Sequence, residues 1–302
     1  MKRKVVLIIF SIVVLILLDC LIGLLFSYLY HKAQYGQIAR QNHCIIESTD
    51  DIIIVGSSEV MRNYDPAVIQ DSLKLTCYTN GSEGQCIYYS YAIIRAIIER
   101  NHFPKFLICD IGNYDVLESD DSQNNIDAAI SRLLPNYYDS KAIRSVINDY
   151  DHTQRIKCLS SAYRYNSKII QIVKCLLYNT SDYNGFEPNN KKLDLQSEKE
   201  ELLTTTEVEF RKIDCIKQTI ELAKEHGVVI IFVHSPKYYV SDNKGVNMID
   251  DICREEGVIF WDFDSLDCFN NPSLFADRHH LNKDGAAVLS RELYGRISQL
   301  NQ

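Results

Sequence analysis

Two hydrophobic patterns alternate along most of this chain. Short, continuous apolar runs are typical of strands that are buried on both faces of a parallel sheet. They occur at 51–55, 75–79, 106–111, 228–233 and 258–263. Between them, apolar residues recur at helical spacing at 66–73, 85–100, 206–226, 247–256 and from about 282 onward. Strands alternating with helices predict an α/β fold, a parallel sheet between two helical layers.

Local signals mark several of the expected helix ends. Asp65 followed by Pro66 is typical of an N-cap with proline at the first helical position. Thr206 and Glu209 have the spacing of a capping box, and Gly227 ends the helix that follows. The final helix is expected to bury a stripe of apolar residues, namely Leu289, Leu293 and Ile297.

The N-terminus has a different pattern. Three basic residues precede an almost unbroken apolar run at 5–30, about the 20 residues that a bilayer-spanning helix requires. Basic residues stay in the cytoplasm, so the rest of the chain is expected outside it, in a bacterial periplasm or on the outer face. No cleavage site is evident, so the sequence predicts a retained single-pass anchor.

The predicted organisation has three parts. Residues 1–32 form a cytoplasmic tip and anchor, residues 33–49 a polar tether, and residues 50–302 the α/β domain. Between about 116 and 205 the periodic pattern loosens and Tyr, Asn, Asp and Ser become frequent. We expect a helical insertion there, either a substrate cover or a structural cap.

Asp19 is an exception within the apolar run. A carboxylate at mid-membrane costs on the order of 2.5–3.5 kcal/mol. The acid either contacts a membrane-protein partner or has no role and is offset by the surrounding apolar residues.

Composition excludes some function classes. The formal net charge is −8 and no basic cluster follows the N-terminus, so no nucleic-acid partner is expected. The ten cysteines include no C-x-x-C pair, so neither a metal site nor a cofactor is predicted from them. Outside the cytoplasm some of them could form disulfides, with a connectivity that sequence does not give.

Polar residues follow three of the predicted strands. Ser57-Ser58, Gly84 and Asn113 stand after the first, second and third strands. Because the carboxyl ends of neighbouring parallel strands lie at one edge of the sheet, these residues are expected to converge. Asp277 and His280 are three residues apart, close enough for the carboxylate to orient the imidazole.

These residue types suit acyl transfer by a serine. Ser58 needs a base to remove its proton, and His280, held by Asp277, is the candidate base. A carbonyl under attack also needs hydrogen-bond donors for its developing charge. The backbone N–H groups of Ser58 and Gly84 and the side-chain amide of Asn113 are the candidate donors.

In this order, the four blocks resemble those of the SGNH (GDSL-type) hydrolase superfamily. The matching blocks are Gly56-Ser57-Ser58, Gly84, Asn113 and Asp277-Arg278-His279-His280. The resemblance implies a flavodoxin-like three-layer sandwich, with Ser58 as nucleophile and with Gly84 and Asn113 in the oxyanion hole. Among membrane-anchored proteins, the Gly-Ser-Ser block looks like that of bacterial D-alanyl-transfer and polysaccharide O-acetylation proteins.

The sequence departs from the family pattern at two positions. Ser57 stands where the family usually has Asp, which makes it a rival nucleophile. The third block has Asn113 directly after its glycine, one place earlier than is common in the family. A metal site at Asp277, His279 and His280 is a weaker alternative, because zinc usually takes a further ligand from elsewhere.

Three functions remain open at this point. The first is an anchored serine esterase that removes acyl groups, acetyl above all, from a cell-envelope glycan. The second is an acyltransferase that receives its acyl group through a membrane partner at Asp19. The third is an interaction protein that keeps the fold without turnover, for which the Ser57 replacement leaves room.

Overall fold

The structure, a computed structural model, describes residues 2–119, 125–177, 183–194, 207–239 and 243–300. Its centre is a five-stranded parallel sheet in the order β2-β1-β3-β4-β5. The strands are β1 Ile52–Gly56, β2 Cys77–Gly81, β3 Phe106–Asp110, β4 Val229–His234 and β5 Ile259–Asp262. This confirms the predicted parallel sheet, and the strand order is the flavodoxin-like one. Only β2 starts two residues later than the apolar run suggested.

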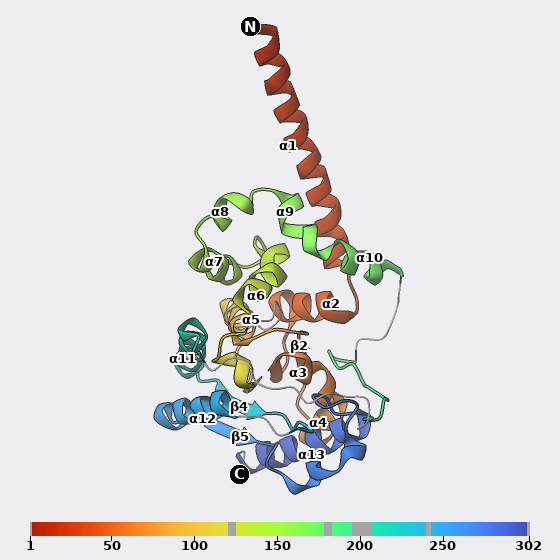
Figure 1. Cartoon of the computed structure of the whole chain (residues 1–302), viewed down its shortest axis with the longest axis vertical. Helices are drawn as coiled ribbons and strands as arrows, with labels where there is room; N and C mark the ends of the chain where they lie inside the picture. Colours follow the sequence, from red (N-terminus) through yellow and green to blue (C-terminus); the bar gives the residue numbers. More distant parts are fainter. Residues whose placement is uncertain (1, 120–124, 178–182, 195–206, 240–242, 301–302) are drawn as a thin grey trace.

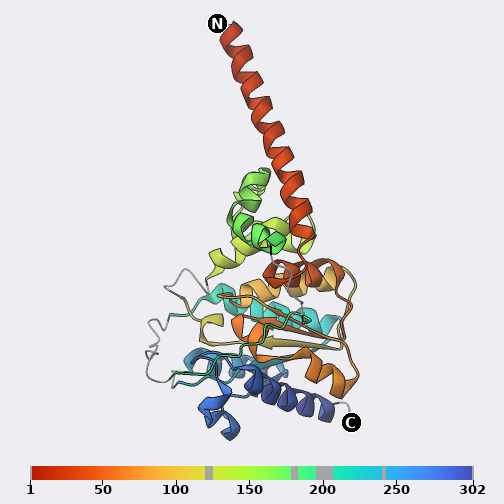
Figure 2. The same cartoon turned by 90° about the vertical axis from the view of Figure 1, so that its right-hand side faces the viewer.

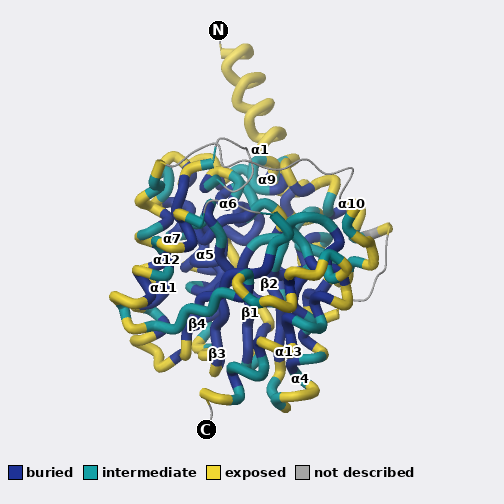
Figure 3. Tube along the Cα trace, turned by 60° about the horizontal axis from the view of Figure 1, so that its bottom comes forward, coloured by how far each residue is buried: buried dark blue, intermediate teal, exposed yellow. Residues whose placement is uncertain are grey.

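Helices cover both faces of the sheet (Figures 1 and 2). One face packs on α5 Ile87–Glu99, α11 Phe210–Glu225 and α12 Lys244–Glu256. The other packs on α3 Ser58–Asn63, α4 Pro66–Leu73 and α13 Lys283–Leu300. Along β1, Ile53 and Val55 face the first layer while Ile52 and Ile54 face the second. Figure 3 shows the strands as the buried centre of the domain.

The region between β3 and α11 is mostly helical as far as Leu177, whereas residues 183–194 are turns and extended chain. It contains α6 Ile126–Leu133, α7 Lys141–Tyr150, α8 Gln154–Lys157, α9 Ser161–Tyr165 and α10 Ile169–Leu177. Short 3₁₀ turns lie at Asn113–Asp115, Leu134–Asn136 and Asn166–Lys168, and two more, Asp267–Asn270 and Pro272–Leu274, precede α13. Helices α6 and α7 pack on α5, which fixes the insertion to one face of the sheet.

The N-terminal helix α1 Lys2–His31 projects from the domain (Figures 1 and 2). Within the described residues it is the one helix long and apolar enough to cross a membrane, judged by length and composition. Its apolar side chains from Val5 to Leu18 are exposed, whereas Gly23 and Tyr30 near its C-terminal end are buried.

The expected tether at 33–49 is instead part of the packed domain. It forms α2 Gly36–Asn42 and a π-helical turn, His43–Glu47. Ile38, Cys44 and Ile45 are buried, and the buried Arg40 donates from Nε to the carbonyl oxygen of Gly81. Polar residues of this segment such as Arg40 form hydrogen bonds to distant parts of the domain, and the local sequence does not reveal these bonds.

The predicted helix caps have different outcomes. The Asp65 carboxylate accepts from the N–H of Ala67, 3.0 Å away, so the cap of α4 is confirmed. Helix α11 begins only at Phe210, and Glu209 is its N-cap rather than the third residue of a capping box. Thr206 lies outside the described residues. A short helix that was not predicted, α3, begins at Ser58.

Candidate active site

The carboxyl ends of β1 and β3 form the floor of the candidate site. The chain passes from β1 to β2 on one side and later to β3 on the other, so this edge is the topological switch point of the sheet. Gly56 ends β1 where the backbone has no room for a side chain. A Cβ there would lie 2.7 Å from Cγ2 of Val60 and 2.8 Å from the carbonyl oxygen of Asp110. This close approach places Ser57 and Ser58 directly above the sheet edge.

Ser58, His280 and Asp277 lie in one hydrogen-bonded line. The Oγ of Ser58 is 2.8 Å from Nε2 of His280. On the other side of the ring, Nδ1 of His280 is 2.9 Å from Oδ1 and 3.0 Å from Oδ2 of Asp277. All three residues are partly exposed. The arrangement has the order hydroxyl, imidazole, carboxylate that activates a serine nucleophile.

Asp277 is held ionised by its surroundings. Its Oδ1 also accepts from the backbone N–H groups of His279, at 2.9 Å, and His280, at 2.8 Å. Burial alone would raise the pKa of Asp277, but these bonds and the charge of His280 lower it to about 2. A permanent carboxylate at Nδ1 keeps the proton there, which leaves Nε2 to accept the proton of Ser58.

The rival serine has a different contact. Ser57 is the N-cap of α3, and its Oγ donates to the carboxylate of Glu59. No contact between Ser57 and His280 is found within the described residues. The geometry therefore favours Ser58 over Ser57 as the nucleophile.

A buried charged pair lies next to the nucleophile. Nζ of Lys237 is 3.8 Å from Oε1 of Glu59. Burial disfavours both charges, but their mutual attraction outweighs it, so the pKa of Glu59 is lowered and the pKa of Lys237 is raised. A Cβ added at Gly112, just after β3, would lie 3.5 Å from the same Nζ. The ammonium group of Lys237 thus sits between the ends of β1 and β3.

Next to this pair is a second buried acid, Asp110, whose pKa is raised. Asp110 accepts hydrogen bonds from the hydroxyl and the N–H of Ser235, and the Ser235 hydroxyl is 2.9 Å from the Tyr64 hydroxyl. Burial, together with the nearby negative charge of Glu59, raises the pKa of Asp110 to about 7. These buried contacts fix the loop after β4 against the end of β3 and the end of α3.

The contacts of Gly84 and Asn113, the two candidate oxyanion-hole residues, do not test that role. Gly84 lies in the turn between β2 and α5 with φ of 63°, a left-handed conformation that suits glycine. Oδ1 of Asn113 accepts from the N–H groups of Gly245, at 3.0 Å, and Val246, at 3.3 Å. Asn113 therefore holds the amino end of α12, and the participation of both residues in an oxyanion hole stays a prediction.

The loop that carries Asn113 is tied down by charged residues that the sequence pattern did not indicate. Oδ2 of Asp115 accepts from the N–H of Gly112 at 2.7 Å, and Oδ1 accepts from Ile87, the first residue of α5. Nζ of Lys212 donates to the carbonyl oxygens of Tyr114 and Leu117. Burial raises the pKa of Asp115 to about 6. The loop conformation thus depends on α5 and α11 as well as on β3.

Two further histidines near the site, His234 and His279, have structural contacts. His234 at the end of β4 is buried, with Nδ1 3.1 Å from Oδ1 of Asp262. The ring of His279 packs against Tyr239 at 5.0 Å between centroids. Within the described ranges no group of three or more His, Cys, Asp or Glu residues is placed to hold a metal ion. All ten cysteines belong to these ranges, and each is a free thiol.

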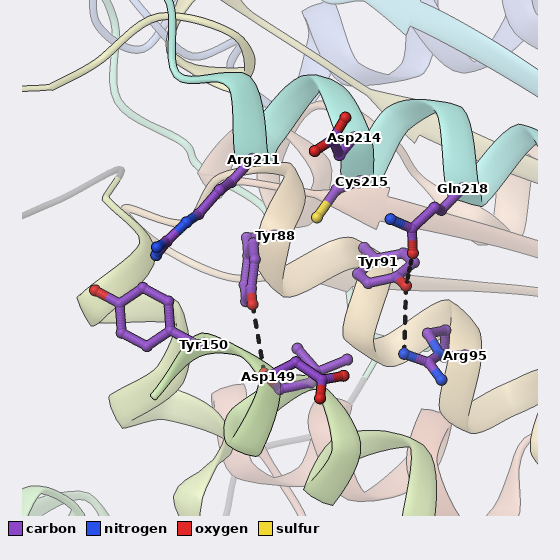
Figure 4. A pocket seen from close by; sticks show the side chains of 10 residues that line it. Tyr88, Tyr91, Arg95, Asp149, Tyr150, Arg211, Asp214, Cys215 and Gln218 are labelled. Carbon is purple, nitrogen blue, oxygen red and sulfur yellow. Dashed lines mark hydrogen bonds between the residues drawn. The ribbon is translucent and has the colours of Figure 1, made fainter. Parts of the chain in front are cut away.

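Two cavities flank the triad. One of about 410 Å³ is lined by Lys237, Arg278 of the triad loop, and the rings of Tyr238 and Tyr239. The other, of about 390 Å³, lies between α2, α10 and α3 and is lined by Met61, three residues after Ser58, and by Glu83, which precedes Gly84. Neither lining includes Ser58, Asp277 or His280 themselves, and a third cavity lies farther along the chain between α5, α7 and α11 (Figure 4). The first two are the candidate spaces for the two parts of a substrate.

The structure adds two residues that sequence reasoning missed, Glu59 and Lys237. Both are charged and stand three residues after the end of a buried parallel strand. That position at the carboxyl edge of the sheet is the signal by which the sequence could have indicated them.

Comparisons with known proteins are limited to two distant structures. No family model and no curated protein matches the chain. A Bacteroides fragilis structure described as an acylhydrolase is 12% identical, with 83% of this chain and 88% of that chain covered and a TM-score of 0.42. A Desulfitobacterium hafniense structure described as a lipolytic protein of the G-D-S-L family is 11% identical, with 81% and 98% covered and a TM-score of 0.41. Because both TM-scores lie below 0.5, the assignment of a function depends on the side chains of this chain.

Proposed function

We propose that this chain is a serine ester hydrolase of the SGNH type. The observation that carries the proposal is the line of contacts from Ser58 through His280 to Asp277, with distances of 2.8 and 2.9 Å. A hydroxyl, an imidazole and an ionised carboxylate in this order are the groups that nucleophilic acyl transfer requires.

The proposed reaction has two halves. Oγ of Ser58 attacks the carbonyl carbon of an ester while Nε2 of His280 takes the hydroxyl proton. The tetrahedral intermediate collapses to an acyl-serine, and His280 returns the proton to the departing alcohol. A water molecule then attacks the acyl-serine with His280 again as the base, and release of the carboxylic acid restores Ser58. Asp277 stabilises the imidazolium that forms in each half.

Charge on the attacked oxygen needs donors in the site. The backbone N–H of Ser58, at the start of α3, is the nearest donor to the reacting centre, because it belongs to the same residue as the attacking Oγ. The N–H of Gly84 and the Nδ2 group of Asn113 are the further candidates. Since Asn113 also holds α12, its replacement is expected to lower stability as well as activity.

We propose an O-acyl group on a cell-envelope glycan as the substrate, with acetyl as the acyl group. Two observations support this choice. The cavity beside Arg278 combines two tyrosine rings with charged and amide groups, a lining that suits a polar ring compound. The apolar helix α1 suits a membrane anchor, and its basic start suits a cytoplasmic N-terminus with the domain on the other side.

The alternatives have less support. The acyltransferase hypothesis took Asp19 as a contact for a membrane partner, but this carboxylate accepts hydrogen bonds from Ser160, Ser161 and Ala162 of the same chain. An interaction protein without turnover would not need the contacts of Ser58 and Asp277 with His280. Both alternatives remain distinguishable by experiment.

The test is labelling of the full-length, detergent-purified protein with a fluorophosphonate, followed by peptide mass spectrometry. We expect the label on Ser58, and no label in Ser58→Ala, whereas Ser57→Ala is the matched control and keeps it. A label on Ser57, or none on the parent, would contradict the proposal. Release of acetate from an acetylated glycan, compared with transfer of acetyl to a second glycan, then separates hydrolase from transferase.

A further inference from the structure

Exposed apolar side chains gather on the insertion, beside the C-terminal half of α1. In α8, in α10 and between α8 and α9, the exposed members are Ile156, Leu159, Ile169, Ile170, Val173 and Leu177. We call this set the apolar platform. Elsewhere on the domain such residues are scattered among different elements, for example Phe103, Phe210 and Leu300. In both views, α8 and α9 form the edge of the domain nearest the projecting part of α1 (Figures 1 and 2).

The platform is fixed to α1 by the side chain of Asp19. The Asp19 carboxylate accepts from Oγ of Ser160 at 2.8 Å and from the N–H groups of Ser161 and Ala162 at 2.8 and 2.9 Å. These bonds cap the start of α9. A carboxylate at membrane depth needs such partners, because lipid offers none. The acid that disrupts the apolar pattern of α1 is therefore satisfied by the insertion itself.

Further contacts extend this attachment toward the C-terminal end of α1. Gly23 lies so close to α9 that a Cβ on it would be 2.2 Å from Oγ of Ser161. The ring of Phe26 stacks on Tyr165 with 6.2 Å between centroids, and the ring of Tyr30 meets the same tyrosine edge-on at 5.9 Å. The C-terminal half of α1 and the insertion thus form one packed unit, so the depth of one in a bilayer sets the depth of the other.

The length of α1 gives the depth of Asp19 in the bilayer, and therefore the depth of the part of the platform that Asp19 contacts. A hydrocarbon core about 30 Å thick takes about 20 helical residues at 1.5 Å each. If the run begins at Val5, it ends near Leu24. Asp19 is fourteen residue steps from Val5, about 21 Å along the helix, and so about 9 Å short of the far boundary of the core. Tilting α1 lengthens the stretch required and moves Asp19 further inside.

The side chains around this level match a membrane boundary. Leu159 precedes Ser160, which binds Asp19, and is 70% exposed. Leu21, Leu24 and Leu25 on α1 are also exposed, so one side of the helix stays apolar and uncovered beyond Asp19. Exposed basic residues, Arg155 and Lys157 of α8 and Lys174 of α10, accompany the platform. Their long side chains can reach lipid phosphates while the neighbouring apolar groups enter the chain region.

We propose that the apolar platform inserts into the outer half of the lipid bilayer that α1 spans. This inference rests on the anchoring proposed above and goes beyond it, because an anchor alone would leave the insertion in water. The platform helices of the insertion, α8 to α10, then act as a collar at the membrane that orients the domain. It also places the cavity between α2, α10 and α3 on the membrane side of Ser58.

The test uses tryptophan fluorescence of the full chain in phosphatidylcholine vesicles with brominated acyl chains, which quench only on contact. Trp261→Phe removes the native tryptophan. On that background Leu159→Trp and Ile170→Trp report on the platform and Leu15→Trp on α1. Phe210→Trp is the control, because Phe210 is 72% exposed and lies on α11, whereas Ile170 is 73% exposed on α10.

Each outcome decides between the two proposals. We expect emission from Leu159→Trp to fall by a fraction comparable with Leu15→Trp. Emission from Ile170→Trp should fall by a smaller fraction, because α10 packs beside Tyr30, nearer the lipid headgroups, while Phe210→Trp is unaffected. Quenching at Leu15 alone would leave the anchor in place and overturn the platform, whose apolar face would then await a protein partner. Absence of quenching at Leu15 as well would overturn both the anchor and the platform.

Discussion

Nζ of Lys237 lies 3.8 Å from Oε1 of Glu59, the residue that follows the proposed nucleophile. Their side chains are 15% and 16% exposed, so neither charge is well hydrated. Removing one member of such a pair leaves the other as an uncompensated buried charge, which costs about 3–5 kcal/mol. The pair therefore links the stability of the domain to the position of Ser58.

The first prediction concerns this pair. Lys237→Met is expected to lower the free energy of unfolding by about 3 kcal/mol, because Glu59 loses its counter-charge. Lys237→Arg keeps the charge and is the control. The double variant Glu59→Gln, Lys237→Met is expected to recover most of the loss. Urea unfolding of the parent, Lys237→Met, Glu59→Gln and the double variant gives the coupling energy. A loss near that of a surface ion pair, below about 1 kcal/mol, would contradict a buried pair.

The second prediction separates Asp277 from a similar acid outside the triad. Asp277→Asn is expected to lower kcat for an activated acetyl ester by about 10⁴-fold, because an amide no longer holds the proton on Nδ1 of His280. Asp262→Asn is a matched control, since Asp262 also contacts a histidine Nδ1, that of His234, at 3.1 Å. Steady-state kinetics should show little change in kcat for that control. Equal losses in both variants would indicate a structural role for Asp277.

Sequence periodicity was sufficient for the sheet and for most of the helices that cover it. Strands β1, β3 and β4 are mostly apolar on both faces, and the α13 stripe of Leu289, Leu293 and Ile297 is fully buried as expected. Local sequence is enough to predict such elements. A helix that is buried on one face shows an apolar stripe, and a strand that is buried on both faces shows a continuous apolar run. The polar helix α2 was missed because its burial depends on partners far along the chain, such as the Gly81 carbonyl for Arg40.

The candidate site could be predicted only in part for the same reason. Ser58, Asp277 and His280 stand in recognisable short blocks, and the structure brings the three into contact. Glu59 and Lys237 carry no such motif, and their relation depends on how the loops after β1 and β4 meet. The partner of Asp19 lies 141 residues away at Ser160, a distance along the chain over which no local pattern operates.

The third prediction concerns pH. The pKa of Asp110 is raised to about 7 in the folded protein, from 3.8, by burial and by Glu59. Between these values the folded state binds more protons than the unfolded state, so the stability that this group contributes is present below pH 3.8 and is lost as the pH rises through 7. The change is on the order of 4 kcal/mol over that interval.

Asp110→Asn tests this assignment, because an amide of the same shape does not titrate. We expect the variant to lose less stability than the parent between pH 4 and 7 in urea unfolding. Asp115 has its pKa raised to about 6, so a smaller slope of the same sign should persist. Asp277 acts in the opposite direction: with a pKa of about 2, its contribution is present above pH 3.8 and is lost as the pH falls through 2. Identical slopes in parent and variant would show that Asp110 is ionised throughout.

The last prediction concerns the end of β1. Gly56→Ala places a methyl group 2.7 Å from Cγ2 of Val60 and 2.8 Å from the carbonyl oxygen of Asp110, so α3 and β3 must separate. Because Ser58 begins α3, a small displacement there breaks its contact with His280, and a misplacement of about 1 Å can cost on the order of 10²-fold in rate. Gly295→Ala is the control, since a Cβ there meets nothing within 4 Å and a helical alanine stabilises by roughly 0.5–1 kcal/mol. The expected pattern is a lower kcat with loss of stability in Gly56→Ala, against unchanged kcat and a higher Tm in Gly295→Ala. Full activity in Gly56→Ala would mean that the Ser58–His280 contact tolerates movement of α3, and the serine would then not depend on the tight exit from β1.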